Sequence, residues 1–174
     1  MKIKSSRGFS ILEIMIVIAI ILIAVSVATP NFNTYRHNTN LKEAARDISS
    51  DISLYRQRAV SENTHYRMTF NASGSDSNYT IEQENPAGSG TYVNLNTLEP
   101  AVPNPKSVGA GNANIVISGT AGFTAGTWII LNPRGTVTNC NPTCTVNLTH
   151  NVTLSTASIN INYMGRANVQ YTLK

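Results

Sequence analysis

The sequence predicts an α+β protein in which a long N-terminal helix packs on an antiparallel β-rich globular domain. Three observations predict this fold class. An apolar stretch runs from Phe9 to Ala28, an apolar stripe with helical spacing follows it, and from His65 onward the hydrophobic pattern repeats every second residue. With 174 residues and 41% hydrophobic content, the chain can form one apolar helix and one modest globular domain.

The first eight residues form a short basic leader that ends at Gly8, directly before Phe9. Its basic residues are Lys2, Lys4 and Arg7. A secretory signal peptide is cleaved after its apolar region, whereas here the Gly8–Phe9 junction precedes the apolar residues. Residues 9–30 would rise about 33 Å as a helix, which is enough to span a bilayer. The basic leader predicts that the rest of the chain lies outside the cytoplasm.

Glu13 is a charged residue inside this apolar stretch. A carboxylate at the centre of a bilayer costs about 2.5–3.5 kcal/mol on insertion scales, so intramembrane carboxylates are usually functional. A plain single-pass anchor is the alternative interpretation. It explains the hydrophobicity, but it explains neither Glu13 nor the Gly8–Phe9 junction.

The helix is expected to break or kink at Pro30, which lacks a backbone N–H, and then to resume. An apolar stripe at spacings of three and four predicts a packing face. It comprises Leu41, Ala45, Ile48, Ile52, Tyr55 and Ala59. We expect the helix to continue to about Glu62 and to end at Asn63.

Short strands are predicted in the second part of the chain, where apolar and polar residues alternate. They are Tyr66–Phe70, Tyr79–Glu84, Thr91–Leu95, Ile115–Ser118, Trp128–Leu131, Thr145–Leu148, Ile159–Tyr163 and Val169–Leu173. The stretch from Asn85 to Asn112 is rich in Pro and Gly, and it is predicted to be a long loop broken by one short strand.

Cys140 and Cys144 enclose an Asn-Pro-Thr segment. In an oxidising compartment we expect a disulfide that clips a turn between two strands. Half of a zinc site is the alternative, but it requires two more ligands. His37, His65 and His150 show no ligand spacing, so neither a metal nor another cofactor is expected.

Charge and motifs argue against catalysis and against binding of nucleic acid through bulk charge. Three of the 13 basic residues lie in the leader, which leaves ten basic residues against nine acidic ones. The sequence contains no GxSxG elbow and no phosphate-binding loop. Acidic residues are sparse from residue 63 onward, being only Asp76, Glu82, Glu84 and Glu99. We therefore expect a non-catalytic protein.

The N-terminus resembles the class III leader of type IV pilins and pseudopilins. The resemblance implies that a prepilin peptidase cleaves between Gly8 and Phe9 and methylates the new N-terminus. Glu13 becomes the fifth residue of the mature chain, where the family pairs it with the Phe9 amine of a neighbouring subunit. Pro30 takes the place of a proline that loosens the helix in many pilin fibres.

Two segments of the C-terminal half are similar to the FimT/FimU and GspH group of minor pilins and pseudopilins. They are Leu131–Gly135, with an apolar-x-Pro-x-Gly turn, and Tyr163–Asn168, with a late Gly-Arg. In FimT-type pilins implicated in DNA uptake, basic residues around this Gly-Arg contact DNA. Arg166 matches, whereas Asn168 stands where a second arginine would strengthen the site. Arg166 and Arg134 are the candidate DNA contacts, and convergence with Lys174 would form a small basic patch.

The resulting expectation is a cleaved leader over residues 1–8, a helix over 9–62 with a membrane and assembly segment at 9–30, and a β-rich head over 63–174. The expected function is that of a minor pilin in pilus assembly. A GspH-type pseudopilin of type II secretion and a DNA-binding minor pilin are the alternatives. The expected location is the inner membrane, with the head outside the cytoplasm, followed by incorporation into a periplasmic or surface filament. The expected partners are the prepilin peptidase and other pilins or pseudopilins, with nucleic acid a less favoured partner.

Overall fold

The computed structural model describes residues 9–74, 77–111 and 114–174, with backbone only at residues 27–31, 110 and 111. The predicted leader, including Gly8, lies outside the described residues. The chain divides into two compact units, Met1–Arg36 and His37–Lys174. The second unit contains all of the β-structure and the second half of the long helix.

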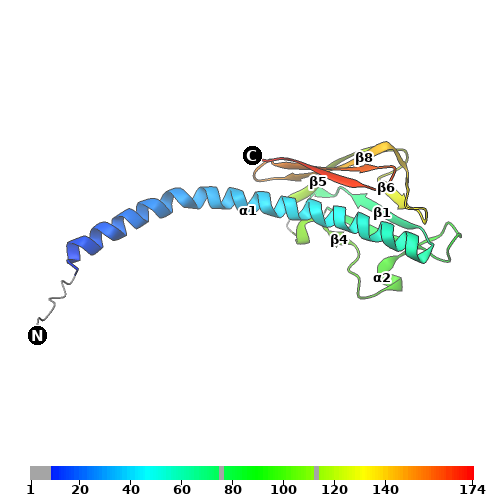
Figure 1. Ribbon diagram of the computed structural model, residues 1–174, viewed down its shortest axis with the longest axis horizontal. Helices are drawn as coiled ribbons and strands as arrows, with labels where there is room; N and C mark the ends of the chain where they lie inside the picture. Colours follow the sequence, from blue (N-terminus) through cyan, green and yellow to red (C-terminus); the bar gives the residue numbers. More distant parts are fainter. Residues whose placement is uncertain (1–8, 75–76, 112–113) are drawn as a thin grey trace, which may run out of the picture. The chain divides into compact units, whose positions relative to one another are not determined.

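Helix α1 spans Ile11–Glu62, a length of 52 residues (Figure 1). The predicted break at Pro30 was wrong, because the helix continues through that position. A proline removes only one backbone donor, so the remaining helical hydrogen bonds on either side of it can still form. The predicted end at Glu62 is confirmed. Asn63 adopts a left-handed conformation with φ of 52°, and the Thr64 N–H then bonds to the Ala59 carbonyl at 3.2 Å.

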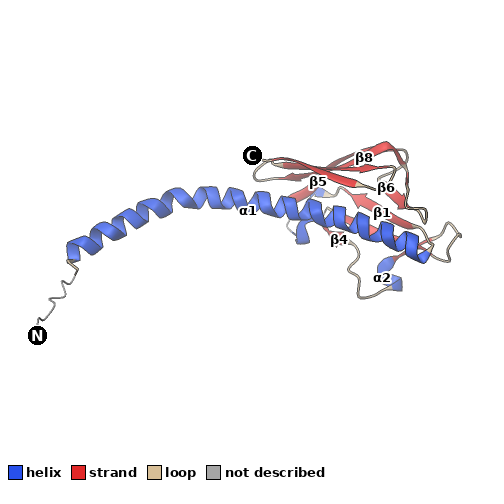
Figure 2. Ribbon diagram, in the orientation of Figure 1, coloured by secondary structure: helices blue, strands red, loops and turns tan. Residues whose placement is uncertain are grey.

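The strands form two antiparallel sheets in the part of the chain that the structure describes (Figure 2). The first sheet has the order β3-β2-β1-β6-β7, and β4 also pairs with β2. Its strands are β1 (Tyr66–Asn71), β2 (Asn78–Glu84), β3 (Tyr92–Asn94), β4 (Lys106–Ser107), β6 (Trp128–Leu131) and β7 (Val137–Thr138). The second sheet has the order β10-β9-β8-β5. Its strands are β5 (Ile115–Phe123), β8 (Cys140–His150), β9 (Thr156–Asn162) and β10 (Ala167–Thr172).

Every strand predicted from the sequence is present; β6 has the predicted bounds, and the bounds of the others are shifted. β5 and β8 are the two that extend furthest beyond the prediction. The two-residue strands β4 and β7 were not predicted, and neither were the short helices α2 (Leu95–Leu98) and η2 (Val108–Gly111). The predicted strand Thr91–Leu95 ends early because the Asn94 side chain accepts a hydrogen bond from the Asn96 N–H at 3.1 Å and caps α2.

The core of the second unit lies between the C-terminal half of α1 and the two sheets. All six residues of the predicted apolar stripe are at most 2% exposed, which confirms the packing face. Sheet residues that complete this core include Tyr66, Met68, Phe70, Ile81, Ile129, Leu131, Val146, Leu148, Ile159 and Ile161. The stripe fixes which side of α1 faces the sheets and therefore which residues remain at its edges.

Polar contacts also join α1 to the sheets. The Asp51 carboxylate accepts hydrogen bonds from the Tyr79 hydroxyl at 2.6 Å and from the Lys106 ammonium at 2.7 Å. Arg58 forms an ion pair with Glu99, and its Nε atom lies 2.8 Å from Glu62. These contacts hold β4 and the segment after α2 against the helix.

Candidate assembly segment and arginine groove

The first turn of α1 has a capped N-terminus. The Ser10 hydroxyl accepts a hydrogen bond from the Leu12 N–H at 3.3 Å, and the Ser10 carbonyl accepts from the Glu13 N–H at 3.1 Å. Ser10 and Glu13 have the Ser-x-x-Glu spacing of a capping box. The helix therefore begins just before Glu13, where a carboxylate interacts favourably with the exposed N–H groups. Sequence reasoning missed the role of Ser10, although this spacing signals it.

Glu13 is solvent-exposed, and so is Phe9, which is 78% exposed. The two residues line a shallow hollow of about 250 Å³ together with Ile14, Val17 and Ile18. Within the described residues, no cationic side chain forms an ion pair with Glu13. The carboxylate is thus available to a group supplied from outside this segment.

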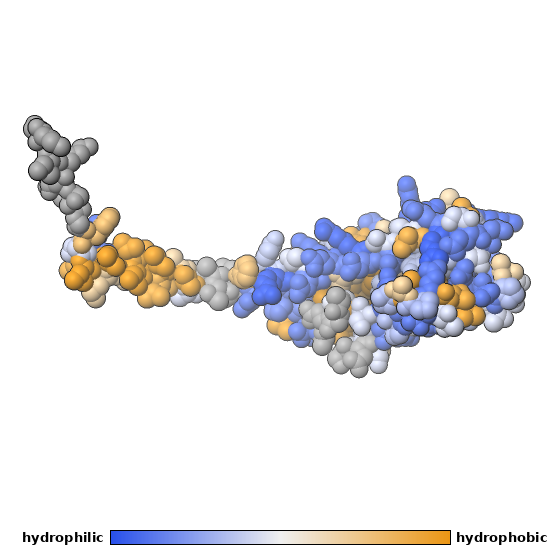
Figure 3. All heavy atoms as spheres, turned by 90° about the horizontal axis from the view of Figure 1, so that it is seen from below, coloured by the Kyte–Doolittle hydropathy of each residue, from blue (hydrophilic) through white to orange (hydrophobic). Residues whose placement is uncertain are grey.

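The N-terminal part of α1 exposes an apolar surface (Figure 3). Every large hydrophobic side chain from Phe9 to Val25 is between 49% and 80% exposed. Contiguous apolar surface of this kind marks a site of contact with membrane or protein. Across the described residues, however, no helix meets both the length and the apolar content needed to cross a bilayer.

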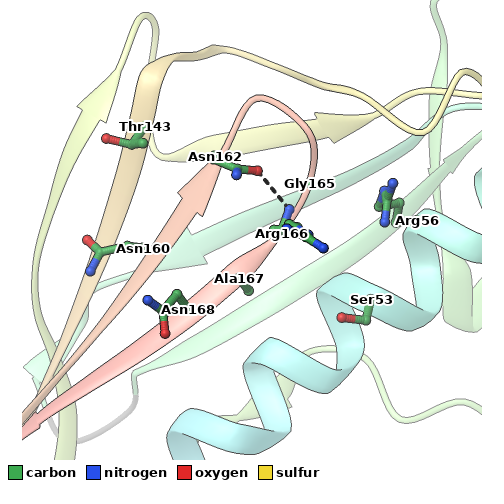
Figure 4. Close-up of a pocket in the computed structure, with 9 residues that line it drawn as sticks. All are labelled: Ser53, Arg56, Thr143, Asn160, Asn162, Gly165, Arg166, Ala167 and Asn168. Atoms are coloured by element: carbon green, nitrogen blue, oxygen red, sulfur yellow. Dashed lines mark hydrogen bonds between the residues drawn. The ribbon is translucent and has the colours of Figure 1, made fainter.

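A polar groove lies between α1 and the edge strand β10 in the second unit (Figure 4). Its volume is about 570 Å³. The lining residues come from α1 (Ser53 and Arg56), β8 (Thr143), β9 (Asn160 and Asn162), the turn before β10 (Gly165 and Arg166) and β10 itself (Ala167 and Asn168). We call this feature the arginine groove.

The side chain of Arg56 is held between two glycine turns. Its Nε atom donates a hydrogen bond to the Gly135 carbonyl at 2.7 Å. Gly135 and Gly165 both have positive φ, of 74° and 69°. A Cβ atom on Gly165 would lie 2.6 Å from Arg56 Cδ, and one on Gly135 would lie 3.4 Å from an Arg56 nitrogen. Gly135 and Gly165 belong to the two C-terminal motifs described in the sequence analysis. The role of Arg56 was not predicted, because the residues around it in α1 give no sign of it.

The turn between β9 and β10 orients Asn162 and presents Arg166. The Asn162 side-chain oxygen accepts a hydrogen bond from the Arg166 backbone N–H at 2.9 Å, as drawn in Figure 4. Asn168 pairs with Asn160 across the two strands, and both side chains line the groove. The Asn168 position is therefore part of this groove, and its side chain is uncharged.

Arg134, the other candidate DNA contact, is not in the arginine groove. It lines a different pocket with Asn63, His65 and Tyr163 among others. Lys174 is remote from Arg166, because it lies eight positions further along a largely extended chain, a span of roughly 26 Å. Its backbone N–H donates instead to Ser155 at 2.9 Å, and its carbonyl accepts from Asn38 at 3.1 Å. Lys174 therefore does not join the two arginines in one basic patch, and Arg134 lines a pocket of its own in the turn beside that of Arg166.

Cys140 and Cys144 are joined by a disulfide, with their Cα atoms 5.3 Å apart. The predicted location was wrong, since both cysteines lie within β8 and not in a turn between two strands. Cys140 pairs with Phe123 of β5 while Cys144 pairs with Ile161 of β9, so the bridged segment already belongs to the sheet. In the described ranges, no three His, Cys, Asp or Glu side chains gather as a metal site would require.

His150 is a fully buried histidine at the end of β8. Its Nδ1 atom accepts hydrogen bonds from the N–H groups of Val152 and Thr153, at 3.3 and 3.5 Å. Its Nε2 atom is buried without a partner, and its ring lies 4.6 Å from that of His37. Burial, and then the charge of His37, lower the pKa of His150.

One family model matches the chain, over residues 3–29, and it describes a prokaryotic N-terminal methylation motif. No curated protein and no solved structure matches the chain. The match covers residues 3–8 of the basic leader, Phe9, Glu13 and the whole exposed apolar segment from Phe9 to Val25. A leader of this type implies membrane anchoring, processing by a prepilin peptidase and assembly with other pilins. The N-terminus thus supports a type IV pilin-like subunit of a pilus or secretion filament.

Proposed function

We propose that this chain is a non-catalytic subunit of a type IV pilus-like filament, and specifically a minor pilin that acts in pilus assembly. The observation that carries the proposal is the methylation motif over residues 3–29. The exposed apolar side chains from Phe9 to Val25 support it, because they require a covering of lipid or of neighbouring subunits.

In this proposal, residues 9–30 insert in the inner membrane and the second unit lies outside the cytoplasm. The basic leader supports this orientation. Assembly then transfers the apolar segment from lipid to contacts with other subunits. The short disulfide loop favours a minor pilin, because many major pilins close a much longer C-terminal loop with their cysteines.

Glu13 is the residue that sets the axial register in this mechanism. Cleavage after Gly8 would create an α-amine on Phe9, and a buried amine and a buried carboxylate compensate one another only when they are paired. Within one helix, four residues separate the two groups by about 6 Å of axial rise. The exposed carboxylate is therefore better placed for the amine of a neighbouring subunit.

The test must separate two roles of Glu13. One is pairing with the Phe9 amine of a neighbouring subunit, and the other is support of the capped first turn of α1. Glu13→Gln keeps the size of the side chain and removes its charge, whereas Ser10→Ala removes the cap and keeps the carboxylate. We expect Glu13→Gln to enter the membrane and to be depleted from sheared filaments, and Ser10→Ala to assemble. Equal depletion of both variants would assign Glu13 to capping, and equal incorporation of Glu13→Gln and wild type would refute the pairing.

A deletion strain tests the narrower assignment to pilus assembly. Surface pili, type II secretion and DNA uptake are scored in parallel. We expect the loss of pili to be the primary defect, with secretion intact. A defect in secretion alone would instead identify a pseudopilin, and loss of uptake with normal pili would identify a DNA-binding pilin.

A further inference from the structure

The arginine groove is lined by two arginines and otherwise by uncharged residues. Apart from Arg56 and Arg166, its lining residues are Ser, Thr, Asn, Gly and Ala. None of the ion pairs formed by the described residues includes either arginine. A guanidinium group carries only donors and stays charged at any physiological pH. The groove is therefore suited to a ligand that supplies an oxyanion.

The asparagines of the groove add donors to this charge. The oxygen of the Asn162 carboxamide must face the Arg166 backbone N–H, which can only donate, and this leaves the Nδ2 group of Asn162 as the available end. The Asn160 oxygen is likewise engaged, by the Thr145 hydroxyl at 2.8 Å. Two guanidinium groups and two carboxamide NH₂ groups therefore line one groove.

The position of Arg56 is fixed before any ligand arrives. Its Nε atom is bound to the Gly135 carbonyl, and its aliphatic part packs against Gly165. The terminal nitrogens of its guanidinium remain for a ligand. A side chain held in this way loses little conformational freedom on binding, which favours affinity.

We propose that the arginine groove binds an acidic saccharide, a sugar unit that carries a carboxylate. Arg56 and Arg166 bind the carboxylate, since the planar guanidinium fork matches its two oxygens. The remaining lining side chains bind sugar hydroxyls. Ser53 donates its own proton to the Ser49 carbonyl at 3.0 Å, so its oxygen is left to accept. The Asn168 carboxamide, which also lines the groove, offers an NH₂ group that donates and an oxygen that accepts.

The same observations disfavour a nucleic acid as the ligand. The groove has no aromatic lining residue on which a base could stack. A phosphate backbone requires a track of cations, but Arg134 lines another pocket and the Lys174 backbone is held at Asn38 and Ser155, away from the groove. The proposal is independent of filament assembly, because every residue that it uses belongs to the second unit.

The test is a binding titration of the full chain in detergent with a galacturonate trisaccharide. A neutral galactose trisaccharide and a short DNA duplex serve as comparisons. We expect saturable binding of the acidic sugar and at least about tenfold weaker binding of the neutral one, because the charge-assisted hydrogen bonds are lost. Absence of binding at millimolar concentration, equal affinity for both sugars, or tighter binding of the duplex would overturn the proposal.

Two variants and a matched control locate the site. Arg166→Gln removes an exposed charge from the groove, and Asn168→Asp adds a repelling carboxylate at an exposed position of β10. We expect each to weaken binding of the galacturonate about tenfold. Arg134→Gln removes the same charge from the neighbouring turn and should leave affinity unchanged. Equal losses in Arg134→Gln and Arg166→Gln, or unchanged affinity in both groove variants, would refute the site.

Discussion

The Nε atom of Arg56 lies 2.7 Å from the carbonyl oxygen of Gly135, and this hydrogen bond joins α1 to the turn between β6 and β7. The same side chain packs against Gly165, in the turn that leads into β10. The two turns are also joined directly, because the Val137 N–H donates to the Tyr163 carbonyl at 2.8 Å. A single helical arginine thus holds one turn from each sheet.

This arrangement predicts that Gly165→Ala destabilises the second unit more than an alanine at another left-handed glycine. The new Cβ would lie 2.6 Å from Arg56 Cδ, in addition to the backbone strain at positive φ. We expect a loss of about 1–3 kcal/mol in the free energy of unfolding, measured by chemical denaturation.

Gly88→Ala is the matched control, because Gly88 has φ of 80° and a Cβ atom added there would meet no other atom within 4 Å. It measures the backbone strain without the contact. A loss in Gly165→Ala no larger than that in Gly88→Ala would show that the contact with Arg56 does not constrain the turn.

Local sequence signals predicted most of the fold. The apolar stripe of α1, its end at Asn63 and the alternation within β9 and β10 each depend on residues close together in the chain. β4 is different, because Lys106 and Ser107 become a strand only by pairing with Tyr79 and Asn78. Short elements of this kind depend on a distant partner, so their own residues carry too little signal.

The arginine groove could be predicted only in part for the same reason. Gly165 and Arg166 form a recognisable sequence motif, but Arg56 has the pattern of an ordinary charged residue beside the packing stripe. Its role arises where α1 meets two turns that lie 79 or more residues further along the chain. The motif of the assembly segment is easier to recognise, since Gly8, Phe9 and Glu13 lie within six consecutive residues.

A fragment beginning at about Tyr35 should fold without the apolar segment. The buried core begins at Leu41, and the second unit contains all of its members. We expect a soluble fragment with a cooperative thermal transition. Cys140 and Cys144 should be unreactive toward a thiol probe until a reductant is added, because the disulfide joins them. Aggregation, or thiol labelling without reductant, would contradict this expectation.

Stability should fall on mild acidification because of His150. The pKa of His150 is lowered in the folded state by burial and by His37, whereas a histidine in the unfolded chain has a pKa of about 6.5. As pH falls below that value, the unfolded chain takes up the proton more readily, so the free energy of unfolding decreases. The stabilisation that neutral His150 contributes is fully present above the pKa of the unfolded chain. It is lost as the pH falls toward the lower pKa of His150 in the folded state.

His150→Asn tests this origin, since the amide oxygen can replace Nδ1 as the acceptor for Val152 and Thr153. We expect its stability to change less than that of the wild type between about pH 7.5 and about pH 5.5. His65→Gln serves as the control, because His65 is partly exposed and bound to Glu84 at 2.7 Å. An unaltered pH dependence in His150→Asn would exclude His150 as its source.

Processing at the Gly8–Phe9 junction is the most direct test of the N-terminal motif. A prepilin peptidase should remove residues 1–8 and add one methyl group to the amine of Phe9, because the matched motif spans this junction. Intact-mass measurement on membranes from a strain with active peptidase should show the shortened, methylated chain. Gly8→Leu should leave the precursor uncut, because a branched side chain replaces the small residue at the cleavage site. An uncut wild-type chain in that strain would contradict the role assigned to the motif, whereas cleavage without assembly would leave processing intact and refute only the filament proposal.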